Sequence, residues 1–246
     1  MEPTIDALLP LLAERWGVPV KLLEGYYADL QSSDELLSAL NELIRDEPRF
    51  AGVQFRHVRE LRVYRSLLYL ITRVVRPKVF VETGVLNGFS STFILLGMRH
   101  NGQGILRSID LPPDDPRIIA QGTTPLPQGR APGWAIPGFL RDRHVLVLGE
   151  AQVLLPRILA EHRPLDIFLH DSDHCYSHMI FEMSLAWLYL RPGGWMLIDN
   201  VEQNSAFDDL TQGVGCPGFV VSSFDTADRV WRHGLVQKPT EGIHLG

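Results

Sequence analysis

Two apolar runs of the chain end in side chains that can do chemistry. The runs Leu165–Leu169 and Trp195–Ile198 are each long enough for a buried strand. They are followed by two carboxylates, an imidazole and an amide, namely Asp171, His174, Asp199 and Asn200. Open α/β sheets bind their ligands outside the carboxyl ends of the strands. We therefore expect the two strand ends to form one site.

Carboxylate and amide oxygens are the ligands that a hard cation such as Mg²⁺ requires. Asp171, Asp199 and Asn200 therefore form a candidate site for Mg²⁺ or another divalent cation. Other interpretations stay open. Asp171 could cap a following helix, and Asp199 with Asn200 could be a turn alone. His174 and His178 have i, i+4 spacing and could bind zinc together with Asp171.

Strands and helices that position these groups alternate from Lys78 onward. The expected strands cover residues 79–81, 104–109, 144–148, 165–169, 195–198, 219–224 and 229–237, and the expected helices cover residues 92–98, 151–161 and 175–190. Such alternation predicts a parallel sheet with right-handed crossovers, and the last two strands, joined by residues 225–228, predict a hairpin. Residues 191–194, Arg-Pro-Gly-Gly, predict a break before the fifth strand. We therefore predict an α/β fold with a Rossmann-like, mostly parallel seven-stranded sheet and an antiparallel C-terminal hairpin.

Two segments lie outside this alternation. Residues 1–75 are helical by pattern, and we expect an N-terminal helical extension that contributes to a ligand pocket or to oligomer contacts, ahead of a main domain of residues 76–246. Residues 111–143 show little periodicity and hold seven of the 17 prolines. A long loop of this kind inside a compact domain is usually functional. We interpret residues 111–143 as a lid; the alternative is a surface that packs against a neighbouring subunit of a homo-oligomer.

Composition excludes several classes of partner. The 246 residues carry a net charge of −6 and no run of Lys or Arg, which argues against binding to nucleic acid or to an anionic membrane surface. No apolar run approaches the roughly 18 residues of a membrane span, and the N-terminus lacks the basic region of a signal peptide. Cys175 and Cys216 form no disulfide or CxxC pattern. We expect a cytoplasmic protein whose partner is a small molecule.

A glycine turn follows the first expected strand. Its pattern, Glu82-x-Gly84-x-x-x-Gly88, differs from the dinucleotide pattern GxGxxG, because Leu86 stands where backbone must approach a pyrophosphate. An acidic residue at this strand end repels phosphate and suits a cationic ligand or a hydroxyl. S-adenosylmethionine has a sulfonium, an amino group and a ribose, and no phosphate. Asp110, at the end of the second strand, stands where an acid would bind ribose hydroxyls.

The turn resembles motif I of the class I S-adenosylmethionine-dependent methyltransferases, in the E-x-G-x-x-x-G-x-S form typical of catechol, caffeoyl-CoA and macrocin-type sugar O-methyltransferases. The order of elements from about residue 76 to the C-terminus is also similar to that fold, and residues 133–151 resemble the macrocin-type group. The resemblance implies cofactor contacts at Glu82, Gly84, Gly88, Ser90, Asp110, Gly149 and Glu150, the last two near the adenine.

The resemblance also implies roles for the first group of residues. In the metal-dependent O-methyltransferases, an Asp after the fourth strand and an Asp-Asn pair after the fifth hold the metal, which here correspond to Asp171, Asp199 and Asn200. The residue three positions after the first Asp is the general base, which here is His174. The implied activity is transfer of a methyl group to a hydroxyl of a small molecule, such as a natural-product sugar or a phenol, with the help of Mg²⁺.

Two other functions compete with this one. The first is a metal-independent methyltransferase acting on nitrogen or carbon, in which Asp199 and Asn200 are structural. The second is a catalytically silent protein of the same fold that serves as a scaffold. The presence of the motif I acid together with Asp171, His174 and Asp199 argues against a decayed site.

Overall fold

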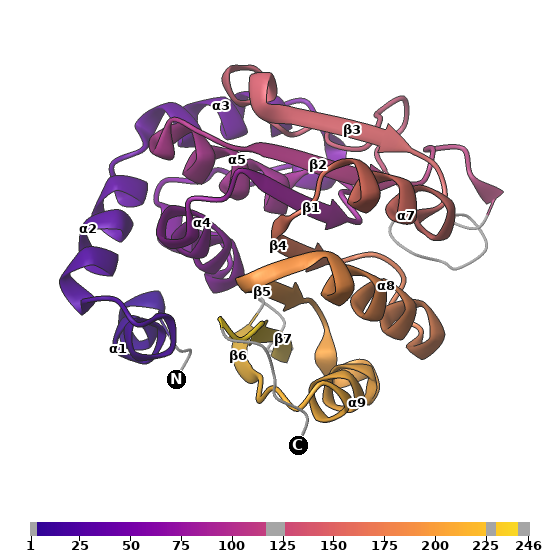
Figure 1. The fold of residues 1–246 in the computed structure, drawn as a ribbon. Helices are drawn as coiled ribbons and strands as arrows, with labels where there is room; N and C mark the ends of the chain where they lie inside the picture. The colour runs from indigo at the N-terminus through magenta and orange to yellow at the C-terminus, as the bar shows by residue number, and fades with distance from the viewer. Residues whose placement is uncertain (1–3, 117–125, 225–229, 241–246) are drawn as a thin grey trace.

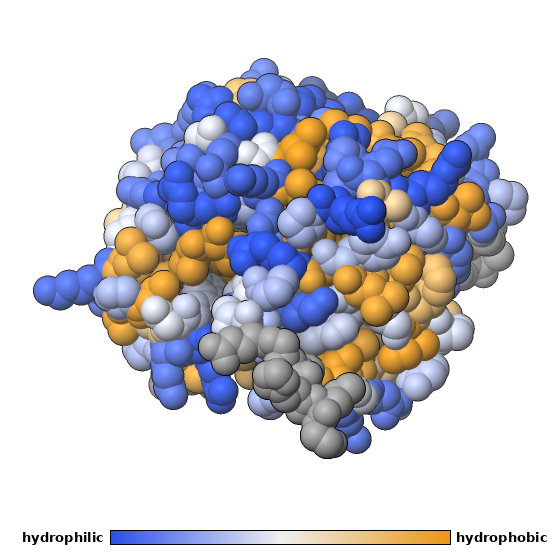
Figure 2. All heavy atoms as spheres, in the orientation of Figure 1, coloured by the Kyte–Doolittle hydropathy of each residue, from blue (hydrophilic) through white to orange (hydrophobic). Residues whose placement is uncertain are grey.

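The protein is described by a computed structural model that covers residues 4–116, 126–224 and 230–240. A seven-stranded sheet forms the centre, and helices cover both of its faces (Figure 1). In the same view, hydrophilic and hydrophobic residues are interspersed over the described part of the surface (Figure 2). No helix in the described ranges is long and apolar enough to cross a bilayer.

The sheet has the order β3-β2-β1-β4-β5-β7-β6. Its strands are β1 Val79–Thr83, β2 Ile105–Asp110, β3 His144–Leu148, β4 Leu165–His170, β5 Leu190–Ile198, β6 Phe219–Phe224 and β7 Val230–Gln237. The first five are parallel, whereas β7 is antiparallel to both β5 and β6. The predicted mostly parallel sheet and its antiparallel hairpin are thus confirmed, although the predicted turn lies outside the described residues. The strand order reverses between β1 and β4, where open α/β sheets form a ligand crevice.

Two layers of helices bury the two faces of the sheet. One face packs against the N-terminal helices and α5, and the other against the later helices. The first layer contains α1 Ile5–Trp16, α2 Val20–Gln31, α3 Asp34–Ile44, α4 Val63–Val75 and α5 Phe89–Asn101, and the second contains α7 Ala151–Glu161, α8 Tyr176–Tyr189 and α9 Ala206–Gly213. Short 3₁₀ turns are η1 Pro48–Phe50, η2 Val58–Glu60, η3 Gly138–Arg143 and η4 Val201–Gln203. Alternation along the strands assigns each side chain to one layer, so that Phe80 joins the first core and Val81 the second.

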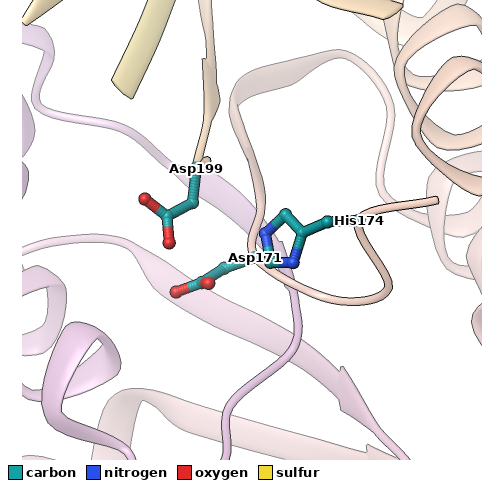
Figure 3. A group of neighbouring side chains, drawn as sticks. All are labelled: Asp171, His174 and Asp199. Atoms are coloured by element: carbon teal, nitrogen blue, oxygen red, sulfur yellow. The ribbon is translucent and has the colours of Figure 1, made fainter. Parts of the chain in front are cut away.

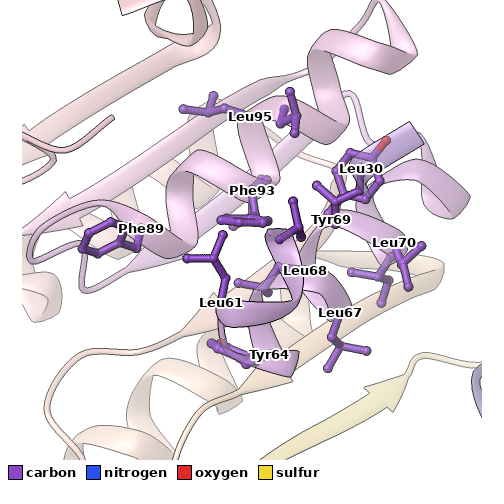
Figure 4. Close-up of a cluster of buried hydrophobic side chains, with 14 of the residues drawn as sticks. Leu30, Leu61, Tyr64, Leu67, Leu68, Tyr69, Leu70, Phe89, Phe93 and Leu95 are labelled. Atoms are coloured by element: carbon purple, nitrogen blue, oxygen red, sulfur yellow. The ribbon is translucent and has the colours of Figure 1, made fainter. Parts of the chain in front are cut away.

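Helix α4 is the part of the N-terminal segment that reaches the centre of the protein. Its residues Leu67, Leu68 and Tyr69 are fully buried, and they lie beside Phe93 of α5 (Figure 4). One continuous apolar core therefore joins residues on both sides of the boundary predicted at residue 75. The division into an extension and a main domain stays a prediction, but α4 belongs to the packed core that supports the sheet.

The break predicted at residues 191–194 ends helix α8 but does not delay the next strand. β5 begins at Leu190, and its pairing with β4 passes from Leu165 opposite Leu190 to Ile167 opposite Trp195. The additional residues bulge out, and the guanidinium of Arg191 donates to Asp166 at 2.6 Å. The Pro-Gly-Gly segment therefore lies inside strand β5 because the neighbouring strand β4 is buried. Local propensity predicts a loop here.

Candidate active site

A cavity of about 620 Å³ opens at the carboxyl ends of β1, β2 and β4. Five segments line it: the N-terminus of α4, the glycine turn, the end of β2, the N-terminus of α7 and the loop after β4. The site residues that the sequence analysis predicted and that line this cavity are Gly84, Ser90, Asp110, Gly149, Asp171 and His174. The switch point of the sheet is therefore also where the candidate residues gather.

Gly84 brings the first and fourth strands together at this edge. Its φ is +82°, and a Cβ at this position would lie 1.9 Å from the carbonyl oxygen of Asp171. The backbone N–H of Asp171 donates to the carbonyl of Thr83 at 2.9 Å, which continues the strand pairing into the loop. A side chain at position 84 is excluded because the two backbones are in contact there.

Asp110 shapes the glycine turn from the neighbouring strand. One of its carboxylate oxygens accepts hydrogen bonds from the N–H groups of Val85 and Leu86, at 2.9 and 2.7 Å, and the other accepts from Leu111 at 2.7 Å. Burial nevertheless raises the pKa of Asp110. Leu86 has a φ of +48°, so the residue in place of the middle glycine is held in a left-handed conformation by these bonds. The predicted ribose contact of Asp110 stays a prediction.

Glu82 lies beneath the turn and is not among the residues that line the cavity. It is fully buried, and the hydroxyls of Ser91 and Ser108 each donate to its Oε2 at 2.7 Å. Its Oε1 has no hydrogen-bond partner within the described ranges. Burial raises the pKa of Glu82 to about 7, although the two hydrogen bonds oppose this shift. The carboxylate of Glu82 therefore lies below the glycine turn, where it is bonded to Ser91 and Ser108. Its predicted direct contact with the cofactor stays a prediction.

Three other predicted cofactor contacts occupy different positions. A Cβ on Gly88 would lie 2.7 Å from the side chain of Ile136, so this glycine allows close packing away from the cavity. Gly149 lines the cavity and donates its N–H to the carbonyl of Asp110 at 2.8 Å. Glu150 is exposed at the N-terminus of α7, where Gln152 lines the cavity instead.

The end of the predicted lid packs against the glycine turn. The indole N–H of Trp134 donates to the side-chain oxygen of Asn87 at 2.7 Å, and the N–H of Ala135 donates to the carbonyl of the same residue at 2.9 Å. Residues 133–137 are therefore buried against the turn. Residues 117–125 lie outside the described part of the chain, and a lid role for the remainder of the segment stays a prediction.

Asp171, His174 and Asp199 come together at this edge of the sheet, and the first two of them line the cavity. Each offers a ligand atom, and these atoms all lie within 4.8 Å of one another. Asp171 and His174 come from the loop after β4, Asp199 follows β5, and the imidazole points toward the two carboxylates (Figure 3). The expectation that the two strand ends form one site is thus confirmed for these three side chains.

The charges of this group are unequal. Burial, together with the neighbouring charge of Asp199, raises the pKa of Asp171 well above its usual range. Burial also acts on Asp199, but a hydrogen bond and the charge of His233 outweigh it and lower its pKa. Burial and the neighbouring His170 lower the pKa of His174, so its imidazole is neutral at neutral pH. The Nε2 atom of His174 is buried without a partner among the described residues.

This donor set fits a divalent cation. Two adjacent carboxylates repel each other unless a proton or a cation lies between them. Two carboxylate oxygens and a neutral imidazole nitrogen are ligand types that divalent metals accept.

Asn200 differs from the other three predicted residues of this group. It is buried in a left-handed conformation with a φ of +55°, and its amide N–H donates to Glu202 at 3.1 Å. Its role as a metal ligand stays a prediction.

His233 and the residues around it, which the sequence analysis missed, hold Asp199 in place. The Nδ1–H of His233, on β7, donates to Asp199 Oδ1 at 2.5 Å. The other ring nitrogen bonds to the hydroxyl of Ser223 at 2.7 Å, and the ring of Tyr64 stacks on the imidazole at a centroid distance of 3.9 Å. The sequence signal for this role is a histidine within the last predicted strand, and that signal does not identify its partner.

The zinc alternative fails because His178 is engaged elsewhere. Its Nε2–H donates to Glu182 at 2.7 Å, and its Nδ1 bonds to the amide of Gln152 at 2.6 Å. Glu182 is fully buried and also accepts from the Nδ1–H of His170 at 2.6 Å. Burial alone would raise the pKa of Glu182, but these two hydrogen bonds lower it to about 2. The ring nitrogens of His178 therefore support the cavity wall and do not join Asp171.

Residues 81–201 match the model of a methyltransferase domain family. Among curated proteins, a candidate O-methyltransferase of Mycolicibacterium vanbaalenii is 28% identical over 146 residues, which cover 59% of this chain and 57% of that protein. A second, from Mycobacterium sp. strain KMS, is 33% identical over 108 residues, which cover 44% of this chain and 42% of that protein. The chain thus spans about half the length of the curated relatives that it matches.

Solved structures share the fold at low sequence identity. An O-methyltransferase of Bacillus cereus in complex with SAH has a TM-score of 0.58 and 17% identity, with 82% of this chain and 91% of that chain covered. The O-methyltransferase TomG of Streptomyces achromogenes, involved in tomaymycin synthesis and solved with SAM, has a TM-score of 0.56 and 17% identity, with 92% and 98% covered.

The buried Glu82 predicts a specific pH dependence of stability. Its pKa is about 7 in the folded protein and near 4.5 in the unfolded chain. At a pH between these two values, the protein takes up a proton when it folds. The stability that Glu82 contributes is fully present below the unfolded-state pKa of 4.5. It is lost as the pH rises through the folded-state pKa of about 7. Between about pH 5 and about pH 8, the free energy of unfolding should fall by up to about 3 kcal/mol.

Denaturant unfolding of Glu82→Gln checks this expectation, because the amide cannot ionise. The fall should be smaller in this variant by the contribution of Glu82, whereas Glu161→Gln, at a side chain that is 69% exposed, should retain the full fall. The same pH dependence in Glu82→Gln and the wild-type protein would contradict the assignment.

Proposed function

Because residues 81–201 are a methyltransferase domain, we propose that this protein is an S-adenosylmethionine-dependent O-methyltransferase. It acts on a hydroxyl of a small molecule, such as a natural-product sugar or a phenol, and a divalent cation assists it. The observation that carries the proposal is the shared cavity: the glycine turn and the Asp171–His174–Asp199 group lie at one edge of the sheet. The names of the relatives and the ligands of the solved neighbours support the same reaction.

The cofactor would lie along the glycine turn. Gly84 and Ser90 line this part of the cavity, and Asp110 with Gly149 line the part that the adenosine would occupy. S-adenosylmethionine supplies an electrophilic methyl group on a positively charged sulfur. The carboxylates around the turn favour that charge and would repel a diphosphate, since Asp110 and Glu82 are both held at this strand edge.

The metal would be held by Asp171 and Asp199, with Asn200 completing the protein ligands. A bound divalent cation acidifies and positions the acceptor hydroxyl. The protein contributes the fixed orientation of Asp199, which His233 and Ser223 hold from behind. Burial raises the pKa of Asp171, and the partly buried position of both carboxylates strengthens their attraction for a cation.

His174 would take the proton of the acceptor hydroxyl. Its imidazole is neutral at neutral pH because burial and His170 lower its pKa, so its free nitrogen can accept a proton. The orphaned Nε2 lies without a partner among the described residues, as expected for an atom whose partner arrives with the substrate. Homo-oligomer contacts and a cytoplasmic location stay predictions.

The experiment that tests the function combines calorimetry with a methyl-transfer assay. S-adenosylhomocysteine should bind, and methyl transfer to hydroxyl acceptors should stop in EDTA and return with Mg²⁺. Activity that survives full chelation would favour a metal-independent reaction on nitrogen or carbon. No binding at millimolar S-adenosylhomocysteine would favour a silent scaffold.

His174→Ala should lower kcat by about 100-fold or more, because a general base contributes this much. The affinities for S-adenosylhomocysteine and Mg²⁺, measured by calorimetry, should stay near their wild-type values. His57→Ala, at an exposed position, is the matched control. A large loss of metal affinity would instead make His174 a ligand, and near wild-type turnover would remove it from the mechanism.

His233→Gln should weaken the binding of Mn²⁺ by about tenfold or more, because supporting hydrogen bonds tune metal ligands to this extent. Calorimetry with Mn²⁺ measures this effect, and His57→Gln serves as the control. Ser223→Ala, which removes only the outer bond, should have a smaller effect in the same direction. Unchanged Mn²⁺ affinity in a folded His233→Gln variant would contradict the supporting role.

A further inference from the structure

Two arginines line the active-site cavity from helix α4. Arg62 and Arg65 are one helical turn apart and are both cavity residues. Burial lowers the pKa of Arg65 to about 10, and the like charge of Arg62 acts in the same direction. They also stand at the N-terminus of α4, the positive end of a helix, where the first turn contains no acidic residue. The protein without a ligand therefore carries two positive charges at the N-terminus of α4, and no acidic residue in the first turn of this helix neutralises them.

Neither guanidinium has an anionic partner among the described residues. Arg65 lies over the ring of Phe89 at 4.5 Å, and Arg62 lies over the ring of Trp231 at 5.5 Å. Asp171 is near enough for its charge to favour ionised Arg65, but no ion pair joins the two in the described structure. Arg191, in contrast, meets Asp166 at 2.6 Å. Arg65 is half-buried, whereas Arg62 is exposed to solvent. Since buried or half-buried charges are normally paired, Arg65 in particular lacks a counter-ion among the described residues.

A position over an aromatic face leaves the N–H groups at the edge of a guanidinium free for hydrogen bonds. These N–H groups match the two oxygens of a carboxylate. Phe89 is itself a cavity residue, so the stacked Arg65 faces the space where an acceptor would lie. A cation bound at Asp171 and Asp199 would also neutralise these nearby carboxylates. The attraction of the two arginines for an anion would then be opposed less by neighbouring negative charge.

We propose that Arg62 and Arg65 bind a carboxylate on the acceptor, so that the substrate is a hydroxy acid. This inference rests on the proposed function and narrows its substrate class. The acid group would anchor the acceptor at α4, and the hydroxyl would lie beside Asp171 and His174, which line the same cavity. A neutral sugar or an unsubstituted phenol would leave the two cations without a partner. The other source of a carboxylate is the amino-acid part of the cofactor, and the experiment separates the two.

The test compares acids with their primary amides, which match them in size. The probes are 3,4-dihydroxybenzoate and its amide, and glucuronate and its amide, titrated by calorimetry into protein saturated with S-adenosylhomocysteine and Mg²⁺. At least one acid should bind the wild-type protein about tenfold or more tightly than its amide, because the charged group gains charge-assisted hydrogen bonds. In the Arg62→Gln/Arg65→Gln variant, acid and amide should bind within about twofold of each other.

Two further variants control for charge and folding. Arg65→Lys retains the charge without the planar fork and should keep part of the preference for the acid. Arg45→Gln, at a side chain that is 64% exposed on the α3 side, should keep all of it. The thermal midpoint of each variant shows whether it is folded.

The results distinguish this inference from the proposed function. Equal binding of acids and amides by the wild-type protein, no binding of either, or a preference that survives in the double variant would overturn the carboxylate site. A double variant that loses about tenfold or more of its affinity for S-adenosylhomocysteine would assign the arginines to the cofactor and would also overturn it. If the wild-type protein binds no S-adenosylhomocysteine at all, the proposed function fails instead.

Discussion

The contact between Gly84 and the backbone of Asp171 is the constraint on which the site depends. The two backbones approach so closely that a Cβ on residue 84 would overlap the carbonyl of Asp171. Because β1 and β4 are neighbours in the sheet, this contact holds the glycine turn and the acidic loop at one crevice. Any side chain here would push the loop away and separate the cofactor half of the cavity from the half that carries Asp171 and His174.

Buried negative charge is the second organising feature. Glu82, Asp110, Asp171 and Asp199 converge around the ends of four strands, and burial acts against ionisation of each of them. The protein compensates locally with serine hydroxyls, backbone N–H groups and His233. The compensation is incomplete at Glu82, Asp110 and Asp171, whose pKa values rise. A site of this kind favours cationic ligands, which is the common property of a sulfonium cofactor and a divalent metal.

Local patterns predicted the elements well where burial and propensity agree. The strand over 144–148 and the helix over 151–161 have the predicted bounds, since apolar runs and a helical pattern there point to the same structure. The pattern failed where packing decides. Arg191–Gly194 lies inside β5 as a bulge, and α9 over Ala206–Gly213, which no motif signalled, covers the sheet through Phe207. Residues 133–143 look like loop by composition but are anchored to the turn by Asn87.

The sequence by itself determined the parallel sheet, the glycine turn and the placement of acids after two strands, because these follow from periodicity and from residue type. It also determined that Asp171 and Asp199 would meet, since parallel strands end at one edge. Only the tertiary structure decided that His174 joins them while His178 turns to Glu182, that His233 supports Asp199 from a distant strand, and that Arg62 and Arg65 face the cavity unpaired. The physical reason is that side-chain direction and long-range packing depend on neighbours that lie far away in the chain.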